Sequence, residues 1–97
     1  MTLPIIWRLH ARSDLAEIIG YVTRENPLAA KRLRKLLMSA VEPVSEHPYL
    51  YPQSELFPGL RKIVAHPNYI IFYKVTATSI EVVNVVHARQ QYPKLLV

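Results

Sequence analysis

The sequence predicts an α+β domain in which one strand and two helices precede three further strands. Three patterns support this prediction: alternating apolar residues at the N-terminus, two stretches of apolar residues at helical spacing, and three strand-like stretches in the second half. Strands joined by short turns pair as antiparallel neighbours, so the last three should form a meander. Both helices should then pack on one face of the sheet.

The N-terminal strand is expected within residues 3–9. Every second residue there is large and apolar: Leu3, Ile5, Trp7 and Leu9. Such alternation places one side of a strand against a core, so Trp7 is assigned to the core rather than to ligand recognition. Pro4 lacks the amide hydrogen that a central strand would need, which places the start of this strand on an open sheet edge.

The first helix is expected over about residues 11–23, and a second helix should begin at Asn26. The two apolar stripes consist of Ala11, Leu15, Ile18, Ile19 and Val22, then of Ala30, Leu33, Leu37, Ala40, Val41 and Val44. Asp14 and Glu17 fall in the first turns of the first helix, where the helix dipole favours acidic groups. Asn26 is suited to capping the second helix and Pro27 to its first turn. Pro43 should disturb its last turns.

Residues 47–59 are expected to form an ordered loop packed over the edge of the core. The stretch holds three prolines and three aromatic residues, too proline-rich for a helix and too apolar for a solvated linker. Gly59 should relieve a turn before the next strand. Three strands are expected over residues 60–66, 69–75 and 80–87, and the last two carry apolar residues on both faces, which indicates central positions.

Composition indicates one globular domain spanning residues 1–97. The chain is 51% hydrophobic and 20% charged and has no cysteine. The lack of cysteine excludes disulfides, thiolate metal sites and a cysteine nucleophile. No apolar run approaches the roughly 18 residues that a membrane span needs, and the N-terminus lacks a secretory signal, so a cytoplasmic protein with no membrane partner is expected.

The formal net charge of +5 is concentrated toward the C-terminus. Residues 56–97 carry five basic side chains and one acidic side chain, Glu81. A positive surface attracts phosphate backbones or an acidic protein segment, and charge alone leaves both open. The second helix adds four basic residues, for which a solvated helix face is favoured over nucleic-acid binding: Lys31, Arg32, Arg34 and Lys35.

No sequence motif for a metal ion or a cofactor is recognisable, and neither is expected. The four histidines lack the paired helical spacing and the carboxylate neighbours of a zinc site: His10, His47, His66 and His87. With two glycines the chain has no glycine-rich phosphate loop, and Asp14, its single aspartate, has no nucleophile motif nearby.

One group of polar residues remains as a candidate site toward the end of the predicted sheet. Its members are Arg61, Lys62, His66, Tyr73, His87, Arg89 and Tyr92. Metal-free RNA cleavage needs such residues, with His or Tyr to move protons and Arg to stabilise negative charge on phosphorus. A non-catalytic interpretation is favoured: Tyr73 is a packed strand residue, His87 a polar group at a strand end, and Arg61, Arg89 and Tyr92 bind a protein partner.

Several short motifs, in this order, resemble the ParE/RelE toxin superfamily over about residues 3–93. They are Ala11-x-x-Asp14-Leu15-x-x-Ile18, Asn26-Pro27-x-Ala29-Ala30, Ser45-Glu46-His47-Pro48, Gly59-Leu60-Arg61-Lys62 and the stretch from His66 to Val75. The final motif, His87-Ala88-Arg89, resembles the His-x-Arg close of the ParE branch.

This resemblance implies the toxin of a bacterial type II toxin-antitoxin pair, with two helices packed against an antiparallel sheet. It also implies a partner, a ParD-like antitoxin encoded beside the toxin. We expect this antitoxin to be acidic and to cover a groove between the helices and the sheet edge with a helix and an extended segment. Toxins of the ParE branch poison DNA gyrase, whereas RelE-type relatives cut mRNA in the ribosomal A site.

The sequence favours the ParE branch and a gyrase-inhibiting toxin that is not an enzyme. RelE-like nucleases carry several lysines and arginines in the loop and strand after the second helix, and residues 47–59 contain no Lys or Arg. The alternative is a metal-independent, ribosome-dependent endoribonuclease using Arg61, His87 and Tyr92 with Glu55, although His87 and Tyr92 are not adjacent as in that pattern. We expect no sequence-specific contact to nucleic acid. The residues expected to bind the target are Arg61, Lys62, His87, Arg89 and Tyr92.

Overall fold

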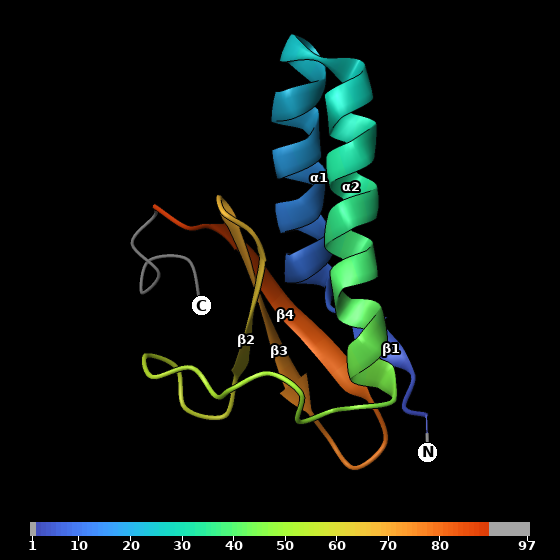
Figure 1. Cartoon of the computed structure of the whole chain (residues 1–97), viewed down its shortest axis with the longest axis vertical. Helices are drawn as coiled ribbons and strands as arrows, with labels where there is room; N and C mark the ends of the chain where they lie inside the picture. The colour runs from blue at the N-terminus through green and yellow to red at the C-terminus, as the bar shows by residue number, and fades with distance from the viewer. Residues whose placement is uncertain (1, 90–97) are drawn as a thin grey trace.

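The computed structural model describes residues 2–89 and confirms the predicted order of elements (Figure 1). The elements are β1 (Ile5–Trp7), α1 (Leu9–Glu25), α2 (Pro27–Val41), the 3-10 helix η1 (Glu42–Ser45), β2 (Arg61–His66), β3 (Tyr69–Val75) and β4 (Ile80–His87). The two helices form an antiparallel hairpin on one side of the sheet and project beyond its end.

The four strands form one mixed sheet in the order β1-β4-β3-β2. The meander of β2, β3 and β4 is antiparallel as predicted, and β1 lies on the sheet edge that Pro4 indicated. However, β1 pairs in parallel with β4, so the fully antiparallel sheet that the resemblance implied is wrong. The helix hairpin returns the chain to the end of the sheet where β1 begins, since the Leu3 amide donates to the Ser45 carbonyl (2.9 Å). After β2 and β3, the third strand of the meander, β4, therefore runs in the same direction as β1.

The first strand is shorter and the first helix longer than predicted. The amide of Arg8 donates to the Val82 carbonyl (3.0 Å), and Leu9 already begins α1 with 81% of its surface exposed. Leu9 therefore does not share the inward side of the strand. Because α1 begins two residues earlier than expected, Asp14 lies beyond the first turn, which contains no acidic residue.

The start and end of α2 follow from Asn26 and Pro43, as predicted. The Asn26 side chain accepts a hydrogen bond from the Ala29 amide (3.1 Å), and Pro27 occupies the first helical position. Pro43 cannot continue the α-helical hydrogen bonds, so the chain tightens into the 3-10 helix η1 after Val41.

The main core lies between the helices and the sheet. Its fully buried members come from both layers: Ala11, Leu37, Val41, Val44, Ile63, Ile71, Tyr73, Ile80 and Val82. Trp7 packs against this core, as its position in the alternation predicted. The helices thus cover one face of the sheet and leave the other to a different segment of the chain.

The loop that follows η1 covers part of the opposite face. Ile70, Phe72 and Val86 are buried there, and the Phe57 ring packs edge-on against Phe72 with centroids 5.5 Å apart. Gly59 turns the chain with a φ of +88°, a conformation that L side chains rarely adopt. The predicted ordered loop is therefore confirmed, and it lies against the sheet rather than beside it.

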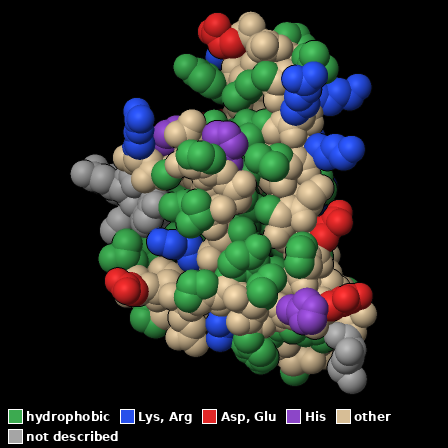
Figure 2. Space-filling model, viewed as in Figure 1, with side chains coloured by type: hydrophobic (Ala, Val, Ile, Leu, Met, Phe, Trp, Pro, Cys, Tyr) green, Lys and Arg blue, Asp and Glu red, His purple; other side chains and the backbone are tan. Residues whose placement is uncertain are grey.

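Hydrophobic and basic side chains gather on different parts of the molecular surface. Figure 2 shows hydrophobic side chains gathered over the middle of this face, while Lys and Arg gather at the upper right over α2. Within residues 2–89 no helix is long and apolar enough to cross a membrane.

Two neighbouring leucines of α2 test the burial of the helix hairpin. Leu37 is fully buried and Leu36 is 43% exposed. We expect Leu37→Ala to lower the free energy of unfolding by about 2–5 kcal/mol, because it leaves a cavity between α2 and the sheet. Leu36→Ala should change it by roughly 1 kcal/mol or less. Denaturant unfolding measures both, and equal losses would contradict this packing.

Candidate functional site

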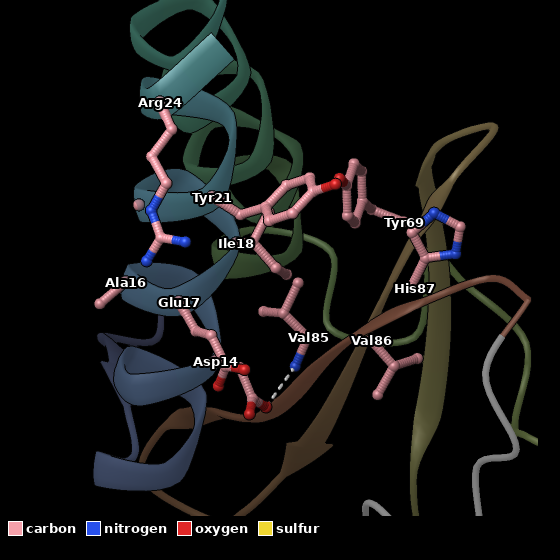
Figure 3. A pocket seen from close by; sticks show the side chains of 11 residues that line it. Asp14, Ala16, Glu17, Ile18, Tyr21, Arg24, Tyr69, Val85, Val86 and His87 are labelled. Carbon is pink, nitrogen blue, oxygen red and sulfur yellow. Dashed lines mark hydrogen bonds between the residues drawn. The ribbon is translucent and has the colours of Figure 1, made fainter. Parts of the chain in front are cut away.

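A groove of about 620 Å³ lies between α1 and the C-terminal half of β4 (Figure 3). It is lined by Asp14, Ala16, Glu17, Ile18, Gly20, Tyr21, Arg24, Tyr69, Val85, Val86 and His87. The helix contributes one wall through residues three or four apart, which share a face of α1. The end of β4, with Tyr69 from β3, contributes the other.

The groove combines an apolar floor with charged ends. Ile18 and Val85 point into it, and Tyr21 and Tyr69 point toward one another across it. Asp14 and Glu17 lie near one end of the α1 wall and Arg24 near the other, so the groove is not uniformly basic. An apolar groove with a few polar groups suits an amphipathic peptide segment better than a small charged metabolite.

Asp14 ties the α1 wall to β4. Its carboxylate Oδ2 accepts hydrogen bonds from the Val85 amide (3.0 Å) and from the Asn84 side chain (3.3 Å). The Asn84 amide nitrogen is also 2.7 Å from Nδ1 of His10. The carboxylate therefore positions α1 against the strand, and the sequence analysis, which assigned Asp14 to the helix dipole, missed this function.

A β-bulge makes this contact available. Phe72 pairs with Asn84 and Tyr73 with Val82, so Val83 has no partner opposite it in β3. A bulge bends its strand and redirects side chains. One signal was present in the sequence: a single asparagine interrupts the run Val82-Val83-Asn84-Val85-Val86, and a buried amide needs hydrogen-bond partners.

Three rings meet where β3 begins and β4 ends. The Tyr69 ring lies edge-on to His87, with centroids 5.3 Å apart, and 5.6 Å from the His66 ring. Nδ1 of His66 accepts from the Asn68 amide (3.0 Å), and Nδ1 of His87 accepts from the Arg89 amide (3.2 Å). Both imidazoles thus stabilise local turns of the backbone through Nδ1.

Arg61 lies at the other end of the sheet and fixes the loop after η1. Its guanidinium donates to the Tyr51 carbonyl (2.7 Å) and lies 4.8 Å from the centre of the Tyr49 ring. The hydrogen bond and the cation–π contact hold the side chain over the loop. The Arg61 guanidinium therefore binds the protein's own loop.

Tyr73 supports the same loop from inside the core. It is fully buried, as the packed-strand interpretation predicted, and its hydroxyl donates to the Pro48 carbonyl (2.9 Å). Burial raises the pKa of Tyr73 above 10.0, while the Tyr51 backbone and the Arg61 charge act in the opposite direction. The phenol therefore stays protonated at neutral pH, so it can hold a carbonyl and is unsuited to act as a base.

The structure divides the predicted site residues between two ends of the sheet. Arg61 pairs with Tyr73, whereas His87 pairs with Tyr69, four residues earlier on β3. At roughly 3.3 Å per residue these levels lie about 13 Å apart along the strands. Lys62 belongs to the first level and His66 to the second. Their separation follows from the meander itself, because β2 and β4 run in the same direction.

Two other members of the predicted set fall outside these levels. Arg89 follows β4 and is exposed, while Tyr92 lies outside the described residues. Glu55 is an exposed loop residue. Among residues 2–89 there is no cluster of three His, Cys, Asp or Glu side chains that could hold a metal ion.

Known proteins resemble this chain in sequence and in structure. A family model described as "ParE toxin of type II toxin-antitoxin system, parDE" matches residues 5–92. The chain is 32% identical over 92 residues to the proposed toxin Y4kP of Sinorhizobium fredii, which covers 95% of each protein. It is also 32% identical over 85 residues to Toxin RelE2 of Caulobacter vibrioides, covering 87% of this chain and 93% of that protein.

A solved structure has the same fold. A chain of the chromosomal ParDE toxin-antitoxin system from P. aeruginosa superposes with a TM-score of 0.79, over 89% of this chain and 96% of the other. The two sequences are 16% identical, so this similarity concerns the fold alone.

The buried phenol of Tyr73 predicts a pH-dependent contribution to stability. At pH 7, Tyr73→Phe should lower the free energy of unfolding by about 1 kcal/mol, because the Pro48 carbonyl loses its donor. The folded-state pKa lies above the unfolded value of 10.0, so the contribution is present below pH 10 and is lost as the pH rises through the folded-state pKa. The difference between wild type and variant should therefore narrow above pH 10.

Unfolding free energies measured at neutral and alkaline pH test this prediction. Tyr21→Phe is the matched control, because Tyr21 is 67% exposed and should change stability at neither pH. A difference between wild type and Tyr73→Phe that stays constant up to alkaline pH would contradict the prediction.

Proposed function

The chain belongs to the ParE toxin family of type II toxin-antitoxin systems, and we propose that it arrests growth by inhibiting DNA gyrase. As a toxin of such a system it has an antitoxin as its partner. We propose that this antitoxin is ParD-like. Inhibition of gyrase requires a binding surface and no catalytic group of the toxin's own.

The division of the polar residues between two ends of the sheet carries this proposal. A ribonuclease site would need an Arg to stabilise phosphate charge close to groups that move protons. Arg61 is instead held by Tyr51 and Tyr49, about four strand residues from the level of His87. Tyr73, beside Arg61, keeps its proton for the Pro48 carbonyl. This arrangement supports a binding function over phosphodiester cleavage.

The end of β4 is the part of the predicted set best suited to contact a target protein. His87 lines the groove, and Arg89, two residues further along the chain, is exposed. Arg and aromatic side chains dominate the energetics of protein interfaces. We therefore propose that gyrase contacts this end through Arg89, with Tyr69 and His87 as a rigid support.

The groove is the proposed site of the antitoxin. A helical segment of the antitoxin could place apolar side chains against Ile18, Val85 and the Tyr21 ring, while Arg24 attracts its acidic groups. Since His87 lines this groove and Arg89 follows it, an antitoxin seated there would also cover the proposed gyrase contact. Neutralisation would then be steric.

An endoribonuclease of the RelE type is the second candidate function. A relative that is 32% identical carries the name Toxin RelE2, and two imidazoles flank Tyr69 at one end of the sheet. Imidazoles are the common groups for moving protons at neutral pH. This function would require a phosphate-binding cation near His87 in place of Arg61.

The groove predicts a strong dependence of antitoxin affinity on Tyr21. Tyr21 is 67% exposed in the structure and would be covered by the antitoxin. We expect Tyr21→Ala to weaken antitoxin binding by about 10- to 30-fold, the range of a typical interface anchor. Leu28→Ala, at an exposed position outside the groove, is the control and should leave the affinity unchanged. Titration calorimetry with the purified antitoxin measures both.

The gyrase proposal predicts inhibition of DNA supercoiling by the purified toxin, with accumulation of cleaved gyrase–DNA complexes. Arg89→Ala should raise the concentration needed for half-inhibition by about 10-fold, because one charged interface contact is lost. Lys74→Ala, an exposed change on β3 outside the groove, should have no effect.

Two outcomes would contradict the gyrase proposal. One is unchanged supercoiling at several-fold molar excess of toxin over gyrase. The other is cleavage of mRNA at codon boundaries in arrested cells while replication continues, which would favour the ribonuclease. An Arg61→Ala variant that retains such cleavage would assign the phosphate contact to another cation.

A further inference from the structure

The exposed side of α2 carries a basic stripe that neither the groove nor the core uses. The stripe consists of Lys31, Arg32, Arg34 and Lys35, all of which are exposed. The helix contains no acidic residue. Its buried residues Ala30, Leu37 and Val41 face the core, and the stripe lies on the solvent side, where Figure 2 shows Lys and Arg gathered.

The stripe opposes the stability of its own helix. Lys31 and Lys35 are four residues apart, and Arg32 and Lys35 are three apart, so like charges are neighbours on the helix surface. The four residues occupy the middle of α2 (Pro27–Val41). A solvated face does not require like charges at neighbouring positions, so a requirement outside the folded monomer accounts for them better.

Within the part of the chain that the structure describes, no acidic side chain forms an ion pair with these cations. The ion pairs within residues 2–89 are Arg8 with Glu81 and His10 with Asp14, and both lie away from α2. Arg32 lies between Leu28 and Leu36, two exposed leucines that are eight residues apart. The stripe therefore has a charged centre, where a protein interface normally has an apolar one.

We infer that the basic stripe binds the phosphate backbone of duplex DNA without reading its sequence. Residues 31–35 rise about 6 Å along the helix axis, and duplex DNA presents one negative charge per about 1.7 Å of its own axis when both strands are counted. Four cations in that length therefore match the charge density of a duplex. The role of this contact rests on the proposed function, because gyrase is bound to DNA and a second contact would strengthen toxin binding there.

The test measures binding of the purified toxin to a fluorescein-labelled 20-bp duplex of arbitrary sequence, by fluorescence anisotropy and without gyrase. The dissociation constant should rise with salt, with a log–log slope of about 3 to 4 for four phosphate contacts. Lys31→Gln/Lys35→Gln should reduce that slope by about 2 and weaken binding at low salt by at least 10-fold. Duplexes of unrelated sequence should bind equally well.

A matched variant separates the stripe from net charge. Arg12→Gln/Lys74→Gln also removes two exposed cations, from α1 and β3, and should leave the slope within about 0.5 of wild type. Thermal unfolding checks the fold, and the stripe variant should be as stable as wild type or more so, because it removes repulsion within α2.

The proposal is overturned if wild type does not bind the duplex at low salt, or if both double variants lose affinity equally. It is also overturned if the stripe variant loses affinity for the antitoxin and keeps its affinity for DNA, since the stripe would then serve an acidic protein. A duplex RNA of the same length reports whether any phosphate backbone suffices, and tighter binding to RNA than to DNA would overturn the assignment to DNA.

Failure of this proposal and failure of the gyrase proposal are distinguishable. DNA binding by the toxin alone is scored without gyrase, and supercoiling is scored separately with the same variants. If the stripe variant loses affinity for DNA but inhibits gyrase as strongly as wild type, the stripe binds DNA and has no role in inhibition. If the toxin binds DNA but does not affect gyrase, the DNA-binding proposal stands and the gyrase proposal is overturned.

Discussion

The structure depends on the burial of β4. One edge of this strand pairs with β3, the first three residues of the other edge pair with β1, and most of its residues are buried. A domain of this size can bury a central strand to this extent only if the rest of the chain is arranged around it. The helix hairpin covers one face and the loop after η1 covers part of the other.

This enclosure determines which polar residues are available for binding. The loop contains no Lys or Arg of its own, and Arg61 and Tyr73 reach it from the strands by donating hydrogen bonds to its carbonyl oxygens. Two of the most plausible reactive groups in the sequence are thus used for folding. Asp14 is used in the same way, between α1 and β4. What remains accessible is the end of β4, the wall of the groove on α1 and the outer side of α2.

The sequence predicted the secondary-structure elements but not the arrangement of residues in the candidate site. Alternation, helical periodicity and the Asn26 cap are local properties, and they predicted both α-helices and the four strands to within a few residues, but not the 3-10 helix η1. The parallel pairing of β1 and the Asp14 contact depend on residues about 70 positions apart, for which one sequence holds no local signal. The bulge at Val83 lies within the β3–β4 pairing, whose register the alternation of apolar residues does not specify, because both strands are apolar on both faces. The separation of Arg61 from His87, in contrast, was already contained in the predicted meander. Arg61 lies at the start of its first strand and His87 at the end of its third, and these two points are at opposite ends of the sheet.

The two helices of the hairpin present different chemistry to their surroundings. The α1 wall of the groove is apolar with mixed charges, which suits a folded peptide segment, whereas the outer side of α2 is uniformly positive. Because the groove is lined by α1 and the sheet alone, a partner seated in it need not contact the basic stripe. An antitoxin could therefore block the end of β4 and leave α2 exposed. Neutralisation of the toxin and its attraction to a polyanion would then be separable properties of one small domain, each controlled by its own helix.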